Sequence, residues 1–446
     1  MKVRLLCRNP DDYQRETKHD IFKVPRNYAP ELHPFQEARE YTRALNATKL
    51  ERVFAKPFLG SLDGHKDGVH CMAKHPLQLS LACSGSYDGE LKIWNLPLAK
   101  CLATVQAHSG YVRGICVDPV NGDNVITVGD DQQIKQWALH ASIKSDPDEP
   151  IHSLMTKGVL QDISHHWKKN QFATCGDQVD IWDHHRASPI RTFNWGVDTV
   201  HKIQYAPIET DILAATAIDR SIILYDSREQ TPLRKLVLKL RSNSVAWNPM
   251  EAFIFTVANE DYNLYSFDMR RLDAPVNIHM GHTSAVLDVD YAPTGREFVS
   301  GSYDRSVRIF SVDKGRSREI YHTKRMQRVM CVLWSMDNKF ILSGSDEMNI
   351  RIWKARAAEK LGPVRPREQR SLQYSERLKE KFAHHPEIRR IARHRQIPKS
   401  IYSAQKELSI MKQSRKRKEA NRRKHSKPGA VPFVADRRSK VLTEES

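Results

Sequence analysis

An aromatic residue recurs along this chain at intervals of 42 to 45 residues. Each occurrence closes a short segment in which apolar and polar residues alternate, which is the period of a half-buried β-strand. The seven positions are Trp94, Trp137, Trp182, Tyr225, Phe267, Phe310 and Trp353. Self-similarity at a fixed period of this length indicates a repeat architecture, in which each unit needs its neighbours to cover its hydrophobic faces.

One copy, residues 281–310, illustrates the content of a repeat. Apolar residues alternate with two aspartates from Leu287 to Tyr291, which predicts a strand with one buried face. Pro and Gly in the following Pro293-Thr294-Gly295 predict a turn. Two more strands, separated by a tight turn, are expected at 297–302 and 306–310.

Polar residues recur at fixed offsets before the aromatic anchor. An Asp lies six residues before it in five copies, and four copies add a Ser or Thr ten residues before it and a His further upstream. The two clearest sets are His65, Ser84, Asp88 and Trp94, and His108, Thr127, Asp131 and Trp137. Copies four and five lack most of the set, and copy six ends in Phe310.

This pattern resembles the WD-repeat family, whose period is about 40–45 residues per propeller blade. The resemblance covers roughly Lys56 to Lys354 and implies an all-β, seven-bladed WD40 β-propeller. In that family the His, Ser or Thr, Asp and Trp of a blade form a buried hydrogen-bonded chain, as buried polar groups require. Because the His–Ser–Asp grouping recurs at one offset, we interpret it as structural and not catalytic.

The chain divides into three predicted regions. Residues 1–55 form an N-terminal arm with a helix expected at 36–54, residues 56–354 form the propeller, and residues 355–446 form a basic helical C-terminal domain. Lys56 to Leu62 is expected to supply the outer strand of the last blade, beside Asn349 to Trp353, which would close the ring. The polar insertion at 141–150 predicts an exposed loop. Helices are expected at 371–384, from Pro386 and from Pro398 to Pro428.

Charge is distributed unevenly between these regions. The chain carries a formal net charge of +18, and the segment from Ala355 onward has 26 Lys or Arg against 10 Asp or Glu. The preceding residues have 45 against 43 and are nearly neutral. This asymmetry predicts a polyanionic partner for the C-terminal segment.

Two basic clusters account for much of that charge. The first contains Arg389, Arg390, Arg393 and Arg395, and the second contains Arg415, Lys416, Arg417, Lys418, Arg422, Arg423 and Lys424. Such runs are typical of nuclear import signals or of sequence-independent contacts with nucleic-acid phosphates. A solvated helix face is the alternative for the first cluster, and a bare import signal is the alternative for the second.

Other features exclude several classes of protein. No apolar run approaches the length of a membrane span, and the N-terminus lacks the apolar core of a signal peptide. Seven cysteines without a C-x-x-C pair favour a reducing compartment and argue against a zinc site. We find no phosphate-binding glycine loop, metal-ligand spacing or nucleophile elbow. The prediction is therefore a chain without enzymatic activity, cofactor, bound metal, small-molecule substrate or membrane partner.

Segments outside the repeats carry a more specific resemblance. RNPDDYQRETKHDIFKVPRNYAPELHPF, ALNATKLERVFAKPFLGSLDGH and PEIRRIARHRQIPKSIY…NRRKHSKPG resemble WD-repeat proteins with a suppressor-of-fibrillarin-like C-terminal domain, also described as cullin-ligase-associated WD factors. The resemblance implies a component of the small-subunit processome in the nucleus and nucleolus, needed for maturation of 18S rRNA. The implied partners are pre-rRNA, the U3 snoRNA particle and other processome proteins. A second implied role is substrate receptor of a cullin-type ubiquitin ligase.

That second role has a correlate in the blades. Such receptors present a W-D-x-R motif whose Arg pairs with groups of the ligase adaptor. Two imperfect versions end in Arg228 and Arg270, with Tyr225 and Phe267 in the place of Trp. A third version, after Trp182, has its Arg one place late. A basic residue after a closing strand is also common without any partner, so the motif leaves both interpretations open.

Overall fold

The computed structural model describes residues 34–139, 149–194, 198–427 and 429–445. Most of the N-terminal arm and of the insertion predicted at 141–150 therefore lie outside the described residues. The chain separates into two compact units, one made of residues up to Ala55 together with 358–394, and the other of 56–357 and 395–446. The segment that we assigned to one C-terminal domain thus contributes to both units.

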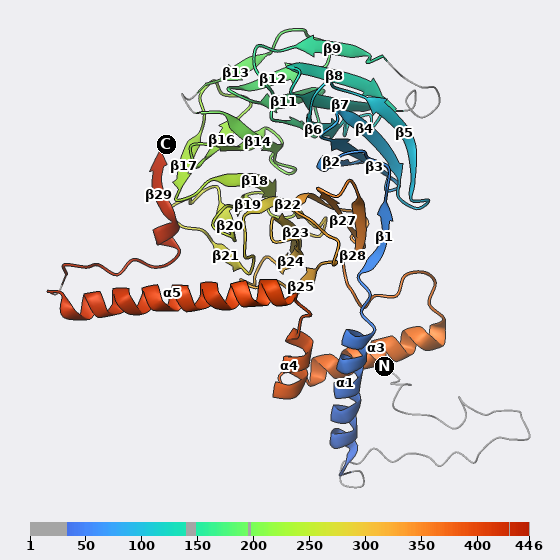
Figure 1. Cartoon of the computed structure of the whole chain (residues 1–446), viewed down its shortest axis with the longest axis vertical. Helices are drawn as coiled ribbons and strands as arrows, with labels where there is room; N and C mark the ends of the chain where they lie inside the picture. The colour runs from blue at the N-terminus through green and yellow to red at the C-terminus, as the bar shows by residue number, and fades with distance from the viewer. Residues whose placement is uncertain (1–33, 140–148, 195–197, 428, 446) are drawn as a thin grey trace, which may run out of the picture. The chain divides into compact units, whose positions relative to one another are not determined.

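The described residues of the larger unit form seven antiparallel β-sheets, arranged as blades around a central channel (Figure 1). Strands that are adjacent in the sequence are hydrogen bonded within each blade, so the pairings are local except where two strands join from outside the repeats. The first strand of each blade lies innermost, at the channel. The predicted seven-bladed propeller is confirmed.

The blades are numbered along the chain. Blade 1 contains β2 (Val69–Lys74), β3 (Leu81–Ser86), β4 (Glu90–Asn95) and β5 (Lys100–Gln106). Blade 2 contains β6 (Val112–Val117), β7 (Asn124–Gly129), β8 (Gln133–Ala138) and β9 (His152–Met155). Blade 3 contains β10 (Asp162–His165), β11 (Gln171–Cys175), β12 (Val179–Asp183) and β13 (Arg191–Phe193).

The remaining blades include two strands from outside the repeats. Blade 4 contains β14 (Val200–Tyr205), β15 (Ile212–Ala217), β16 (Ser221–Asp226), β17 (Arg234–Leu238) and β29 (Val441–Glu445). Blade 5 contains β18 (Ser242–Trp247), β19 (Ile254–Asn259), β20 (Asn263–Asp268) and β21 (Asn277–Met280). Blade 6 contains β22 (Val286–Tyr291), β23 (Glu297–Ser302), β24 (Val307–Ser311) and β25 (Glu319–Tyr321). Blade 7 contains β26 (Val329–Trp334), β27 (Phe340–Ser345), β28 (Ile350–Lys354) and β1 (Phe58–Leu62).

The recurring Asp makes the turn between the second and third strands of a blade. In blade 6 the carboxylate of Asp304 accepts a hydrogen bond from the backbone N–H of Ser306 at 3.0 Å, and Arg305 between them has a φ of 62°. The equivalent bonds in blades 1, 2, 4 and 5 measure 2.9–3.2 Å. Since a left-handed residue other than Gly is costly, the local bond from Asp stabilises a turn that the hairpin needs.

Blade 2 contains the complete polar chain. The Nδ1 of His108 donates to Asp131 at 2.8 Å, and its Nε2 accepts from the hydroxyl of Thr127 at 2.9 Å. The indole N–H of Trp137 also donates to Thr127, at 3.1 Å. The polar groups of the buried His108, Thr127 and Trp137 therefore have partners where water does not reach them.

Blade 1 contains only part of the same chain. Ser84 lies within 2.6 Å of the Nε2 of His65 and accepts from Trp94 at 2.7 Å. Asp88, however, bonds the hydroxyl of Ser86 and the backbone N–H of Glu90, and no described residue bonds the Nδ1 of His65. The two sets predicted to be equivalent thus differ in their link between His and Asp.

Ring closure depends on the segment before the first repeat. β1 pairs with β28 in an antiparallel register that joins Phe58 to Trp353 and Leu62 to Ile350. The rings of Phe58 and Trp353 lie 5.5 Å apart, and Leu62 is buried. The prediction that the N-terminal segment completes the last blade is confirmed.

Acidic side chains join neighbouring blades at the channel, around a cavity of about 210 Å³. Asp162 of blade 3 accepts from the backbone N–H of Ile203 in blade 4 at 3.1 Å and pairs with Lys202 at 3.2 Å. In blade 6, Asp288 accepts from the N–H of Val332 in blade 7 at 2.9 Å. These carboxylates satisfy N–H groups on the inner edge strands, which would otherwise lack partners.

The end of the chain adds a fifth strand to blade 4. β29 pairs with β17, with Val441 opposite Leu238 and Glu445 opposite Lys235. The 3₁₀ turn before it (Arg438–Lys440) contacts blade 5, where Lys440 pairs with Asp261 at 2.9 Å. We had predicted only helices in the basic segment, so this strand is an addition to the expected architecture.

The smaller unit is a cluster of three helices: α1 (Gln36–Val53), α3 (Pro366–Lys381) and α4 (Pro386–Arg393). Its core contains Ala44, Leu378 and Ile388, one residue from each helix. Ion pairs surround this core, such as Lys379 with Glu51 at 2.8 Å. Helices predicted from separate ends of the sequence therefore share one core.

The longest helix, α5 (Lys399–His425), belongs to the larger unit. Ile401 is buried, and the side chain of Gln405 donates to the carbonyl of Gly281 next to blade 6. Beyond Ile410 almost every residue of α5 is exposed (Figure 1). No helix among the described residues is long and apolar enough to cross a membrane.

The difference between blades 1 and 2 predicts unequal effects of one substitution. Asp131→Ala removes the acceptor for the buried Nδ1 of His108 and the turn bond, and we expect a loss of about 2–3 kcal/mol in the free energy of unfolding. Asp88→Ala removes only the turn bonds and should cost about 1 kcal/mol. Chemical denaturation of the full chain measures both values, and equal losses would contradict the assignment of the polar chain.

Blade 5 predicts a pH dependence through His279. This residue is buried, donates to the carbonyl of Lys314 at 2.9 Å and lies 3.0 Å from the hydroxyl of Ser266. Burial lowers the pKa of His279 to about 4. The unfolded chain binds the extra proton below pH about 6.5, so the contribution of His279 to stability is present above that pH and is lost as the pH falls toward 4.

His279→Gln removes this titration. We expect the variant to lose roughly 3 kcal/mol less stability than the parent chain between pH 7 and pH 4. Urea denaturation at pH 7, 5.5 and 4.5 measures the difference. An unchanged pH dependence would mean that folding does not lower the pKa of His279.

Candidate partner-binding surfaces

Arg228 extends from the end of β16 in blade 4. Its Nε and Nη2 donate to the two oxygens of Asp226 at 3.1 and 2.9 Å, and its backbone N–H adds a third bond at 2.9 Å. Burial opposes ionisation of Asp226, but the guanidinium outweighs this and lowers the pKa of the carboxyl. The Arg side chain is 64% exposed, so Asp226 orients it without covering it.

Blade 5 repeats this geometry at Arg270. The bonds from its Nε and Nη2 to Asp268 measure 3.0 and 2.7 Å, and its side chain is 65% exposed. The guanidinium also lies over the ring of Phe253, 4.5 Å from the centroid. Arg228 and Arg270, here called the arginine pair, therefore occupy equivalent places on adjacent blades. No described residue bonds the Nη1 group of either side chain, so both groups can bind a partner.

The third version of the motif does not share the geometry. The backbone N–H of Arg186 bonds the carbonyl of Asp183 at 3.2 Å, and within the described ranges its guanidinium forms no ion pair with that carboxylate. Because its Arg comes one residue later in the sequence, this version lacks the two bonds from guanidinium to carboxylate that Arg228 and Arg270 form.

A neighbouring element near the arginine pair was absent from the sequence prediction. Arg234 of β17 donates to the carbonyl of Arg270 at 3.1 Å and pairs with Glu444 of β29 at 3.4 Å. The acidic end of the chain therefore lies beside the blade edge that carries the arginine pair. Short strands this far apart in sequence give no local signal of their pairing.

The first basic cluster is divided by the structure. Arg389, Arg390 and Arg393 are exposed on α4, where they line a shallow pocket with His384 and His394. The hydrophobic side of α4 lies in the core of the three-helix unit, so the arginines form its outer face.

Arg395 belongs to the other unit and is partly buried there. Its Nε donates to the carbonyl of Arg318, and it lies 3.7 Å from Glu319 in blade 6. The guanidinium predicted to bind nucleic acid is thus engaged within the chain.

The second basic cluster lies on the exposed part of α5. Arg415 to Lys418 are consecutive, and a helix turns by about 100° per residue, so their side chains point to four sides. Lys416 pairs with Asp436 at 2.7 Å, and Arg423 lies over the ring of Phe433 at 4.8 Å. The helix carries positive charge around its whole circumference, which is unlike an amphipathic helix that packs on a protein.

Comparison with known proteins finds relatives that match almost the whole length of the chain. The profile of the Sof1-like domain matches residues 355–441. Relatives named DDB1- and CUL4-associated factor 13, from Xenopus laevis and Homo sapiens, are each 60% identical over 442 residues, covering 99% of both chains. Protein SOF1 of Saccharomyces cerevisiae is 42% identical over 464 residues, covering 99% of this chain and 94% of that protein.

The chain belongs to this family of WD-repeat proteins with a Sof1-like domain. Its fold also resembles the solved WD40 β-propeller domain of Doa1, with a TM-score of 0.58, 19% identity, and coverage of 67% of this chain and 96% of that one. At this identity the likeness concerns the fold alone.

The repeat profile distinguishes two groups of blades in this family member. The WD domain, G-beta repeat matches residues 56–95, 99–138, 274–311 and 318–354, which correspond to blades 1, 2, 6 and 7. Blades 4 and 5, which carry the arginine pair, diverge from the repeat, and so does blade 3. Divergence from the repeat therefore coincides with the unusual side chains.

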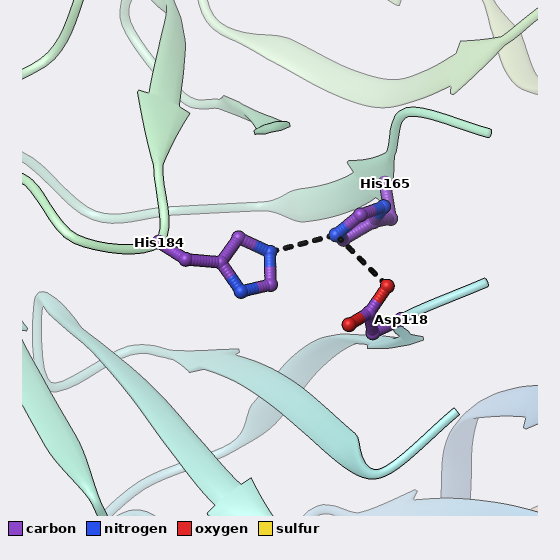
Figure 2. Close-up of side chains that lie close together, drawn as sticks. All are labelled: Asp118, His165 and His184. Atoms are coloured by element: carbon purple, nitrogen blue, oxygen red, sulfur yellow. Dashed lines mark hydrogen bonds and ion pairs between the residues drawn. The ribbon is translucent and has the colours of Figure 1, made fainter. Parts of the chain in front are cut away.

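Blade 3 contributes to a cluster of two histidines and one aspartate (Figure 2). The Nε2 atoms of His165 and His184 lie 2.7 Å apart, and Asp118 of blade 2 lies 3.7 Å from the Nε2 of His165. All three residues are buried. Burial lowers the pKa of His165 to about 4 and also lowers the pKa of His184.

Proposed function

We propose that this protein is a non-enzymatic scaffold of the nucleolar small-subunit processome, required for pre-18S rRNA processing and assembly of the 40S ribosomal subunit. The observation that carries the proposal is the exposed second half of α5, which is basic on every side while the repeats are nearly neutral. The 42% identity to Protein SOF1 over nearly the whole chain supports the same conclusion.

The chemistry of α5 suits RNA. Seven cations between Arg415 and Lys424 sample all sides of one helix, so phosphates on more than one side of it can be neutralised at once. Basic side chains that meet phosphates and 2′-hydroxyls do not need to read bases. The arginine face of α4 offers a second contact of the same kind. The partners of these surfaces are the pre-rRNA and the U3 snoRNA particle, and the blades bind other processome proteins.

A second function is favoured by the arginine pair. Relatives with 60% identity carry a name that associates them with DDB1 and CUL4. We infer that Arg228 and Arg270 contact the adaptor of a cullin-type ubiquitin ligase, for which this chain acts as substrate receptor. Because an aspartate preorganises each guanidinium, less side-chain entropy is lost when a carboxylate or carbonyl of the adaptor binds it.

Neutralising part of α5 tests the RNA contact. We expect Arg417→Gln, Lys418→Gln and Arg422→Gln together to weaken binding of a pre-18S rRNA fragment by about tenfold or more, and to reduce the slope of affinity against salt concentration by about 2. Gln preserves helix propensity, so α5 should remain folded. Filter binding across a range of salt concentrations measures both quantities.

The matched control removes three exposed cations from α3, with Arg367→Gln, Arg370→Gln and Arg377→Gln. Net charge changes equally in both variants. Equal weakening by the two triple variants, or an unchanged salt slope in the α5 variant, would refute a specific role of α5.

Charge reversal tests the ligase contact. Arg228→Glu and Arg270→Glu together should abolish binding to purified DDB1, since a paired interfacial charge contributes about 2–5 kcal/mol when its partner is desolvated. Arg186→Glu is the control, because Arg186 lacks the bidentate geometry, and it should bind normally. Wild-type binding by the double variant would exclude the arginine pair, provided that its melting temperature is unchanged.

A further inference from the structure

Blade 3 lacks the polar chain that supports blades 2 and 6. Its anchor Trp182 donates to Thr174 at 2.9 Å, but position 176, which corresponds to the turn Asp of other blades, is Gly. The cluster of Asp118, His165 and His184 supplies the buried polar groups at this part of the ring (Figure 2). We propose that this cluster binds one divalent metal ion of the zinc class, which joins blade 2 to blade 3.

The hydrogen bonds fix which nitrogen of His165 is available. Its Nδ1 lies 2.7 Å from the carbonyl oxygen of His166, and a carbonyl only accepts, so Nδ1 carries the proton. The lone pair of Nε2 then points toward His184 and Asp118. A metal-binding histidine is typically oriented in this way by a bond from its second ring nitrogen to a backbone carbonyl.

The charge of the cluster favours a cation. Asp118 is fully buried, and its carboxylate accepts from the backbone N–H of Val120 at 2.8 Å and from the side-chain amide of Asn121 at 3.4 Å. Among the described residues, no Lys or Arg forms an ion pair with it, whereas the buried Asp162 pairs with Lys202. A buried carboxylate beside two imidazoles is costly unless a positive charge joins it.

The distances also suit a small ion. Tetrahedral zinc with bonds of about 2.0–2.1 Å separates its ligand atoms by about 3.3 Å. The separation of the two nitrogens, 2.7 Å, and that of nitrogen and oxygen, 3.7 Å, lie on either side of that value. Small side-chain rotations bring all three atoms to one ion, with water as a fourth ligand.

A second group of possible metal ligands differs from this cluster because cations of the chain already neutralise it. His65, Asp88 and Glu90 are also close together, but Lys66 and Lys92 already pair with Glu90 at 2.5 and 3.1 Å. Cations of the chain itself neutralise that group. Among the described residues, no lysine or arginine neutralises the cluster of blade 3 in this way.

The position of the cluster gives the ion a structural role. The residue that follows the innermost strand binds the next blade at three other places: His75 bonds the carbonyl of Gly122, His166 lies 3.4 Å from Asp211, and Asn248 bonds the carbonyl of Gly295. Asp118 holds the same position after β6 and faces His165 in blade 3. A metal ion here completes the connection between blades 2 and 3.

Metal analysis of the full chain, purified without a histidine tag, tests the proposal. We expect about one zinc per chain after dialysis, and visible absorption typical of tetrahedral cobalt after exchange with Co²⁺. Asp118→Asn, which retains the acceptor for Val120, and His184→Asn should both lose the metal and the cobalt absorption. His279→Gln removes a different buried histidine and should retain both.

Thermal unfolding supplies the second measurement. A chelator should lower the melting temperature of the parent chain and leave that of His184→Asn unchanged. A metal-free parent chain whose melting temperature responds to neither zinc nor chelator would overturn the proposal and show a strut of hydrogen bonds only. Equal zinc content in the parent chain, the two cluster variants and the control would also overturn it, because the metal would then be adventitious.

Discussion

The pairing of β1 with β28 is the constraint on which the propeller depends. Six blades are built from local meanders, but blade 7 takes its outer strand from the opposite end of the repeats. Without this pairing, the ring would have a three-stranded last blade with an open edge. The buried Leu62 and the contact of Phe58 with Trp353 make the pairing favourable in hydrophobic terms as well as in hydrogen bonds. Closure therefore joins the start of the repeat region to its end.

Closure alone does not hold neighbouring blades together, since their sheets are not hydrogen bonded to one another through the strands. Apolar clusters that span neighbouring blades, such as the one that contains Ile93 and Val125, and polar side chains on the innermost strands provide this connection. Asp162 and Asp288 reach across to backbone N–H groups of the next blade, one repeat period further along the chain. Because these carboxylates alternate with core-facing residues along their strands, the same two-residue period produces both the core and the contacts between blades. Two ion pairs, Lys202 with Asp162 and Lys74 with Asp290, add to these contacts.

Local features of the sequence were sufficient for much of this fold. The aromatic period predicts seven blades, the Asp of five copies directly precedes a turn residue with positive φ, and Pro386 marks the start of α4. Two other long-range contacts had no such signal. Val441 to Glu445 could have paired with any free edge, and α1 could have packed on any apolar surface, yet they join β17 and α3. The candidate site shows the same division: the sequence identifies Arg228 and Arg270, but not the approach of Asp118 to His165 and His184 from another blade.

Blades that diverge from the repeat explain how one ring combines a generic frame with specific surfaces. A polar chain such as that of His108 and Asp131 stabilises its own blade. The stability of a repeat protein is approximately the sum over its repeats, so the propeller remains folded when a few blades lack this chain. Blades 3 to 5 are the ones that diverge from the repeat profile. Phe253, whose ring lies against the guanidinium of Arg270, and the His pair of blade 3 occupy a framework that four regular blades already secure. In this chain the blades that diverge from the repeat are therefore also the blades that carry the arginine pair and the His pair.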